Sequence, residues 1–139
     1  MSLFSFDKYD AYMRIGWLNK LLGNRGERVA ARFLKKQGYK ILARQAKNSV
    51  GEIDLIAMDR DTIVFVEVKT RSSLATGHPA EAVGYQKQKQ ISRTALVWLK
   101  ERNLLNHRCR FDVIAIIWKE NTDPVIEHYT SAFDAIGEF

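Results

Sequence analysis

The sequence predicts an α/β fold in which helices flank a mixed five-stranded sheet. The chain has 139 residues, of which 46% are hydrophobic and 27% charged, and this composition suits one globular domain. Helical and strand-like segments follow one another in the order helix, three strands, helix, two strands. The run Ile63–Val68 is apolar on both faces, which is typical of a central strand covered from both sides.

The first helix is predicted over residues 25–37. Asn24 can cap its start, and Glu27 at the third helical position completes a capping-box pair. Gly38 closes the pattern, as glycine often does after the last helical turn. The helix therefore has a start signal and a stop signal of its own.

Alternating apolar positions indicate three strands after this helix, and two more strands follow a second helix. The turn Asp59–Asp61 between the second and third strands suits a hairpin. The segment 71–84 lacks periodicity and predicts a long loop. The expected elements are strands at 39–47, 50–58 and 62–70, a helix at 85–102, and strands at 110–118 and 125–129.

Residues 1–22 are predicted to form an aromatic, partly helical extension outside a single domain of residues 23–139. No segment contains the roughly 18 consecutive apolar residues that a membrane span needs, and the N-terminus lacks the pattern of a signal peptide. Cys109 is the only cysteine, which excludes an intrachain disulfide framework. We therefore expect a cytoplasmic protein with no membrane partner.

Charged residues interrupt the otherwise apolar third strand. Strand alternation puts Glu67 and Lys69 on one face. The same period places Asp54 of the second strand on the face of Ile56 and opposite Ile53. If these two strands form a hairpin, Asp54 pairs close to Glu67, because both are nearly equidistant from the turn. Two carboxylates and an ammonium group are therefore expected on one patch.

Such a patch indicates metal-dependent phosphodiester hydrolysis. Burying unpaired charge is costly, and two nearby carboxylates repel each other unless a cation lies between them. Carboxylate oxygens suit Mg²⁺ or Mn²⁺, which coordinate phosphate readily, so Asp54 and Glu67 are the candidate metal ligands. Lys69 adds a charge that can orient water and stabilise negative charge at phosphorus. The alternative is a solvated salt bridge between Glu67 and Lys69, with Asp54 on the surface.

Glu27 has two interpretations. In a helix it shares a face with Ala30, Ala31 and Leu34, which should lie against the sheet, so its carboxylate can reach the patch. It can equally form the capping box with Asn24, or be favoured there by the helix dipole. The sequence leaves both interpretations open.

Several motifs occur in the order and spacing of a known protein family. They are Gly26-Glu27, Gly51 to Ile56, Val66 to Arg71, Pro79 to Val83, Lys87 with Ile91, Arg110 to Val113, and Ala132-Phe133. Over about residues 24–134 the chain resembles the YraN-type uncharacterised protein family. That family is similar to the PD-(D/E)XK nucleases, particularly the archaeal Holliday junction resolvases.

The resemblance implies a restriction endonuclease-like core with the element order α-β-β-β-α-β. It implies that Asp54 and Glu67 are metal ligands and that Lys69 is the catalytic lysine. It also makes Glu27 a catalytic acidic residue carried by the first helix. Ile53 stands where the motif name has proline, a position that the superfamily varies freely.

Basic residues flank the acidic patch. The formal net charge is +6, and the stretch 28–48 contains seven basic residues and no acidic one. A second basic stretch covers residues 83–110. Contacts from such residues to phosphates supply most of the sequence-independent affinity for nucleic acid. The residues expected to bind nucleic acid near the patch are Arg71, Lys87, Lys89 and Arg93.

The leading functional hypothesis is a Mg²⁺-dependent endonuclease acting on DNA, with branched or junction DNA as a candidate substrate and RNA as an alternative. A second hypothesis is a nucleic-acid-binding protein that keeps the nuclease core without efficient catalysis. A third is an adaptor that binds a protein partner through residues 1–22. A homodimer is a further expectation, because two active sites would suit a junction-cleaving enzyme.

Overall fold

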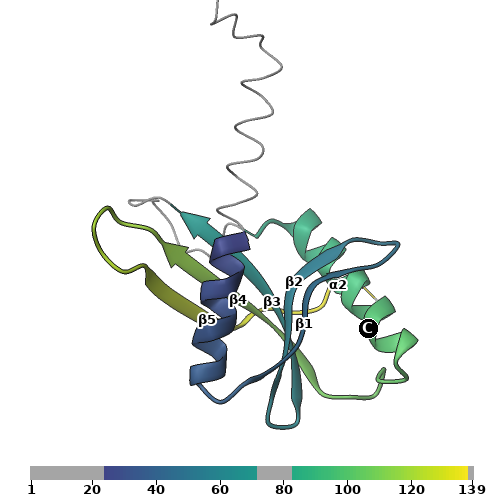
Figure 1. Ribbon diagram of the computed structural model, residues 1–139. Coiled ribbons are helices and arrows are strands. Elements are labelled where there is room, and N and C mark those ends of the chain that lie inside the picture. Colours follow the sequence, from purple (N-terminus) through teal and green to yellow (C-terminus); the bar gives the residue numbers. More distant parts are fainter. Residues whose placement is uncertain (1–23, 72–82, 138–139) are drawn as a thin grey trace, which may run out of the picture.

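The computed structural model describes residues 24–71 and 83–137, which form one five-stranded sheet in the order β1-β2-β3-β4-β5 (Figure 1). The β3–β4 pair is parallel, and the three other pairs are antiparallel. The predicted extension 1–22 and most of the predicted loop, residues 72–82, lie outside the described residues. The strands are β1 (Lys40–Lys47), β2 (Glu52–Asp59), β3 (Thr62–Arg71), β4 (Cys109–Ile117) and β5 (Val125–Phe133).

Two helices cover the described sheet, one on each face (Figure 1). The first helix (residues 24–36) precedes β1, and α2 (Tyr85–Glu101) lies between β3 and β4 in the chain. The core on the side of the first helix consists of Ala30, Ala31, Leu34, Leu55, Ala57, Val64, Val66, Ile114 and Ile116. The core on the α2 side consists of Ile53, Ile56, Ile63, Phe65, Val83, Ile91, Ala95, Trp98, Leu99, Phe111 and Val113. Since β3 contributes to both cores, the prediction of a doubly covered central strand is confirmed.

The first helix ends where the sequence predicts. Gly38 has a φ of 93°, a left-handed conformation that glycine adopts without steric cost. The Gly38 N–H donates to the Lys35 carbonyl and the Tyr39 N–H to the Leu34 carbonyl, both at 3.0 Å. These two bonds form a Schellman motif, which satisfies carbonyls at the helix end and turns the chain into β1.

The strands β2 and β3 separate beyond the rung that pairs Leu55 with Val66. From there β2 remains paired with β1, whereas β3 continues alongside β4 up to the rung of Arg71 and Ile117. The sheet therefore opens into a fork, by which we mean the gap between β2 and β3 beyond Leu55. Residues 67–71 form its β3 arm.

The face alternation of β1 and β2 slips by one residue at the fork. Ile53 and Ile56 are three residues apart, yet both pack in the core on the α2 side. Ala43 and Ala46 of β1 pack against this same core. The register between the two strands is unchanged over this region, so both strands slip together around Gln45. The expectation that Ile53 faces away from Ile56 is therefore wrong, because it assumed unbroken alternation.

The last strand is longer than the sequence predicts. β5 extends to Phe133, beyond the predicted end at residue 129, because a bulge lets its pairing with β4 continue past a register shift next to Asp112. Ser131 in the bulge has a φ of 49°, and its N–H donates to Asp112 Oδ1 at 3.0 Å. A side chain of β4 thus accepts a backbone bond where the regular ladder is interrupted.

The predicted α/β class is confirmed as a mixed, mostly antiparallel five-stranded sheet between two helices. Within residues 24–71 and 83–137, neither helix combines the length and the apolar character needed to cross a membrane. The fork between β2 and β3 is the main irregularity on the β1 side of the sheet, and it contains the charged residues that the sequence singles out.

Candidate active site

Asp54 lies at the fork, on the rung between the Arg44–Leu55 and Ala46–Ile53 pairs of β1 and β2. It comes one residue before the last β2–β3 pair, and its Oδ2 accepts a hydrogen bond from the Val68 N–H at 2.8 Å. The carboxylate therefore satisfies a β3 backbone donor beyond the end of the regular ladder. If the β2–β3 register continued for one more pair beyond Leu55 and Val66, Asp54 would lie opposite Glu67. This agrees with the sequence prediction that the two residues are nearly equidistant from the hairpin turn.

Glu67 is the buried member of the patch, with a side chain only 8% exposed. The Lys69 Nζ lies 3.7 Å and the Lys87 Nζ 3.9 Å from Glu67 Oε1. Lys69 follows Glu67 on the same face of β3, whereas Lys87 comes from the first turn of α2. Two lysines from different elements thus compensate one buried carboxylate, as its desolvation requires.

Two carboxyl groups beside Asp54 have raised pKa values. Burial, and then repulsion by Asp54, raises the pKa of Glu67 above its usual range, against the opposing attraction of Lys87 and Lys69. Burial also raises the pKa of Glu27 to about 7; a hydrogen bond from Gln45 opposes this rise, and the charge of Asp54 adds to it. Asp54 therefore lies within electrostatic reach of both Glu27 and Glu67.

Glu27 reaches the fork from the first helix. Its Oε2 accepts a hydrogen bond from Gln45 Nε2 at 2.8 Å, and the same amide donates to Asn24 Oδ1 at 2.6 Å. Asn24 lies within the helix and not at its cap. Of the two interpretations of Glu27, the structure therefore favours contact with the fork over the capping box.

Gly26 allows the first helix to approach β3 closely at this point. A methyl group at Gly26 would collide with Cγ2 of Thr70 and would lie 3.7 Å from Cδ1 of Ile116. Gly26 precedes Glu27 and Thr70 follows Lys69 in the sequence. This close contact therefore sets the separation between the two elements that carry the charged side chains.

The donor chemistry of the fork suits a hard divalent cation. Asp54 and Glu67 offer carboxylate oxygens, and a cation between them would relieve the repulsion that raises the pKa of Glu67. Over the described ranges 24–71 and 83–137, no three His, Cys, Asp or Glu side chains are placed to hold one ion. Mg²⁺ is commonly bound by one or two carboxylates, with waters and phosphate oxygens in its other positions, so the pair fits this ion.

The residues predicted to bind nucleic acid do not all join this cluster. Lys87 does so through Glu67. Arg71 is the last residue of β3 and lies on the same face as Glu67. Its charge acts on Tyr129 of β5 instead. A hydrogen bond with Glu127 raises the pKa of Tyr129, and the positive charge of Arg71 opposes this rise. Lys89 is half-buried and Arg93 exposed on α2, and neither takes part in the ion pairs of Glu67.

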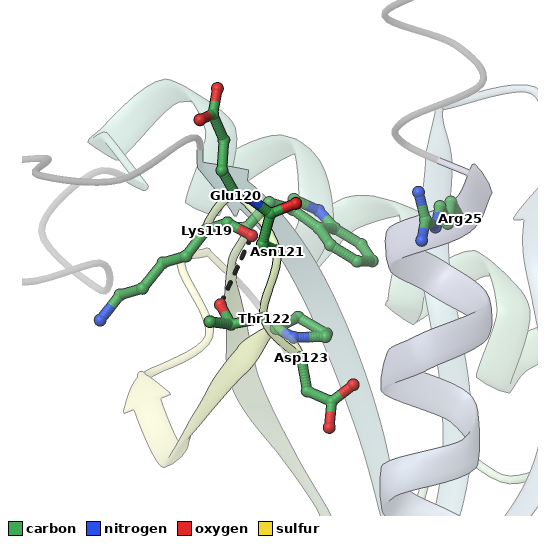
Figure 2. A pocket seen from close by; sticks show the side chains of 8 residues that line it. Arg25, Lys119, Glu120, Asn121, Thr122 and Asp123 are labelled. Carbon is green, nitrogen blue, oxygen red and sulfur yellow. Dashed lines mark hydrogen bonds between the residues drawn. The ribbon is translucent and has the colours of Figure 1, made fainter.

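Two pockets lie beside the described start of the first helix. The smaller, of about 220 Å³, is lined by Asn24, Glu27, Arg28, Arg44 and Gln45. The larger, of about 820 Å³, is lined by Arg25 and residues 118–124. Figure 2 shows Arg25 across this hollow from the loop, in which the Thr122 hydroxyl donates to the Lys119 carbonyl. The larger pocket contains none of the predicted site residues, so size does not identify the site here.

Sequence reasoning missed Gln45 and gave Lys87 only a phosphate-binding role. Gln45 has a φ of 47° within β1, and its side chain joins Asn24 and Glu27. Left-handed backbone is usually signalled by Gly, Asn or Asp, so a glutamine inside a strand gave no sequence signal. Lys87 lies 18 residues after Lys69 in the sequence, and only the packing of α2 brings it to Glu67.

Comparison with known proteins identifies the family. The model of the Uncharacterised protein family UPF0102 matches residues 26–116, a range that includes the candidate site. A UPF0102 protein of Trichlorobacter lovleyi is 49% identical over 121 residues, covering 86% of this chain and 95% of the relative. A UPF0102 protein of Rhodopirellula baltica is 47% identical, covering 86% of this chain and 74% of the relative. A UPF0102 protein of Geobacter sulfurreducens is also 47% identical, covering 84% of this chain and 91% of the relative. The chain therefore belongs to the UPF0102 family, and the YraN-type resemblance is confirmed.

Proposed function

We propose that this protein is a divalent-cation-dependent nuclease that hydrolyses phosphodiester bonds in DNA, with the restriction endonuclease-like core of the PD-(D/E)XK enzymes. The observation that carries the proposal is the fork, where Asp54 has Glu27 and Glu67 as neighbours and two lysines approach Glu67. The motif resemblance supports it, and the order helix, β1, β2, β3, α2, β4 is compatible with that core.

The carboxylates of Asp54 and Glu67 would hold Mg²⁺ or Mn²⁺ in this proposal. When bound, such a cation polarises a phosphate oxygen as a Lewis acid. Glu67 also holds Lys69, whose side chain is 32% exposed and can therefore meet a phosphate that approaches from solvent. The ammonium group then stabilises the negative charge that develops on the phosphoryl oxygens. Lys87, 3.9 Å from the same carboxylate, adds a second positive charge from α2.

Glu27 supplies a proton acceptor near this position. In the protein without a bound cation, burial raises its pKa to about 7, so this carboxylate is a stronger base than an exposed glutamate and is suited to take a proton from water. Its half-buried position on the first helix keeps it close to Asp54 while one side of it lines the smaller pocket. A general base of this kind is what hydrolysis by water requires.

Basic residues on the first helix and β1 support the choice of a polyanionic substrate. All of them are exposed, and two, Arg28 and Arg44, line the smaller pocket together with Glu27. They are Arg25, Arg28, Arg32, Lys35, Lys36, Lys40, Arg44 and Lys47. Exposed cations of this kind bind backbone phosphates without regard to sequence and orient a duplex on the protein.

A cleavage assay with isosteric variants tests the proposal. Branched, flapped and single-stranded DNA, and RNA of the same sequences, are incubated with purified protein in Mg²⁺ or Mn²⁺ and separated on denaturing gels. We expect cleavage of DNA by the wild type, and a loss of at least about 100-fold in Asp54→Asn and Glu67→Gln, because each removes one ligand charge.

The matched control is Asp61→Asn. Asp61 pairs with Arg108 at 3.5 Å, and both side chains are 73% exposed, so the same chemical change there should leave cleavage at the wild-type rate. Cleavage that survives in both Asp54→Asn and Glu67→Gln would refute the assignment of the site.

A second candidate function is a nucleic-acid-binding protein with the same core and no efficient catalysis. The observation that favours it is the set of exposed basic residues on the first helix and β1, which can bind backbone phosphates whether or not a cation is held at the fork. Salt-dependent binding of DNA without cleavage in either cation would select this function over the nuclease.

A further inference from the structure

Gln45 makes two side-chain hydrogen bonds that join β1 to the first helix. Its Nε2 donates to Asn24 Oδ1 at 2.6 Å and to Glu27 Oε2 at 2.8 Å. An amide nitrogen has two hydrogens, so both donors of Gln45 are used. A bond from a neutral amide to a carboxylate is charge-assisted and directional, and it therefore fixes where the Glu27 carboxyl group points.

The backbone of Gln45 is unusual for its place in the fold. With a φ of 47° it is left-handed, a conformation that costs energy in any residue with a Cβ atom. Among the described residues, Arg60, Asn103 and Asn121 are also left-handed, but each lies in a turn. Gln45 instead lies inside a strand between two regular rungs of the β1–β2 ladder.

Ser131 is the other described residue that is left-handed within a strand, and it offers a comparison. Its N–H donates to the Asp112 carboxylate, and the bulge around it serves that bond. Gln45 likewise donates to a carboxylate, that of Glu27. In both cases the strained residue delivers a hydrogen-bond donor to an acidic side chain.

The left-handed turn at Gln45 decides which face its side chain occupies. Ala43 packs on the α2 side, so in an unbroken strand residue 45 would also face α2. The slip puts Ala46 on the α2 side instead, and Gln45 then faces the first helix, where Asn24 lies. Without the strained backbone the amide would lie on the wrong face of the sheet to reach Glu27.

We propose that Gln45 is a positioning residue of the candidate active site, whose side-chain amide holds the Glu27 carboxyl group toward Asp54. This inference rests on the proposed nuclease function and deepens it. The pocket of about 220 Å³ lined by Glu27 and Gln45 also contains Arg28 and Arg44 in its wall, so an anionic substrate can approach the carboxyl group that Gln45 holds.

Two variants separate the amide from the backbone. Gln45→Glu keeps the length of the side chain but removes both donors. Gln45→Gly removes the side chain and also relieves the left-handed strain, and its melting temperature shows whether the fold is kept. Asn121→Gly is the control, because it relieves the same conformation (φ 58°) in the loop between β4 and β5.

The readouts are the affinity for Mn²⁺ measured by calorimetry, and kcat and KM for DNA cleavage. We expect both Gln45 variants to lose about 10- to 100-fold in Mn²⁺ affinity or in kcat, the usual effect of removing a group that orients a site carboxylate. The KM for DNA and the melting temperature of Gln45→Gly should stay at wild-type values, and Asn121→Gly should match the wild type throughout.

A third readout needs neither metal nor activity. The side-chain amide signals of Gln45 in a ¹H–¹⁵N spectrum should move when Glu27 is changed to Ala. The signals of Gln88, whose Nε2 donates to the Val83 carbonyl at 2.8 Å, should stay in place. Unchanged Gln45 signals would overturn the inference, because the contact with Glu27 would then be absent in solution.

The outcomes also separate this inference from the proposed function. If the wild type cleaves DNA and both Gln45 variants match it in kcat and in Mn²⁺ affinity, the positioning role is wrong and the nuclease stands. If the wild type binds Mn²⁺ but cleaves no substrate, the nuclease fails, and a loss of Mn²⁺ affinity in both variants still supports the positioning role. If the wild type does not bind Mn²⁺, both fail.

Discussion

Asp112 is the most completely buried charged residue in the described structure, with a side chain that is 0% exposed. Its oxygens accept hydrogen bonds from the Arg110 guanidinium at 3.1 Å, from the Ser131 N–H at 3.0 Å and from His128 Nε2 at 2.8 Å. Arg110 in turn donates to Asp59 at 2.9 Å. This network lies at the opposite end of β2 from the fork, and it joins β2, β4 and β5.

Removing the Asp112 carboxylate should destabilise the fold strongly. Asp112→Ala leaves Arg110, His128 and the Ser131 N–H without their main acceptor, and breaking a buried ion pair typically costs about 3–5 kcal/mol. Arg110 is 20% exposed and keeps Asp59, so we expect the lower end, about 3 kcal/mol, in urea unfolding. The exposed Asp61→Ala should change stability by less than about 0.5 kcal/mol, and equal effects of the two changes would contradict this view of the network.

The same network predicts how stability depends on acid. Burial alone would raise the pKa of Asp112, but hydrogen bonds from His128, Arg110 and the Ser131 N–H outweigh it and lower the pKa below the ordinary value of 3.8. The contribution of Asp112 is therefore complete above about pH 4 and is lost as the pH falls through the lower folded pKa. The free energy of unfolding, measured in urea from pH 7 to pH 2, should fall less steeply below pH 4 in Asp112→Asn. Parallel curves for the variant and the wild type would show that Asp112 has no lowered pKa.

At the scale of elements, the contact between the first helix and β3 is set by Gly26 and Thr70. Alanine is the better helix former by about 1 kcal/mol, so Gly26→Ala should stabilise an isolated helix. In this fold its methyl group collides with Cγ2 of Thr70. Overpacking of this kind usually costs about 1–3 kcal/mol, which equals or exceeds the gain in helix propensity.

We therefore expect Gly26→Ala to lower the free energy of unfolding by up to about 2 kcal/mol, the overpacking cost less the gain in helix propensity. Thr70→Ser removes the methyl group in the way, so the double variant should recover stability relative to Gly26→Ala alone. A double-mutant cycle in urea measures this coupling. Additive effects of the two changes would show that the helix does not approach β3 at this point.

The elements also show where sequence reasoning succeeds and where it fails. The face alternation of β3 and the proximity of Asp54 to Glu67 could be predicted from the sequence. In a regular antiparallel hairpin, the pairing of two residues depends only on how many residues separate each of them from the turn. The slip at Gln45 could not be predicted, because the contact that accompanies it, between Gln45 and Glu27 of the first helix, is tertiary and no local pattern contains it. The length of β5 was underestimated for the same reason: the bulge at Ser131 depends on Asp112 in another strand.

Over the whole molecule, charge is divided between a central acidic fork and exposed basic flanks. The basic side chains of the first helix and β1 are exposed, whereas Glu67 is buried at the fork. The net charge of +6 therefore combines an acidic fork with basic flanks. The sequence predicted this division, but it could not predict that Lys87 of α2 would pair with Glu67.

This division predicts a graded dependence of DNA binding on salt. Arg44 lines the pocket that contains Glu27, and Arg44→Ala should reduce the slope of log K against log salt by about one unit, the value expected for one lost phosphate contact. Lys100 lies in the last turn of α2, some 20 Å along the helix from Lys87, and Lys100→Ala should leave the slope unchanged. Fluorescence anisotropy over a salt series measures both. Equal slopes for wild type and Arg44→Ala would remove β1 from the binding surface.

The central claim is that Asp54 and Glu67 share a divalent cation at the fork, and anomalous diffraction from crystals soaked in Mn²⁺ tests it most directly. We expect one strong anomalous peak between the two carboxylates, and no peak there in crystals of Asp54→Asn prepared in the same way. Manganese bound only elsewhere on the protein, or a peak at the fork that persists in Asp54→Asn, would contradict the claim.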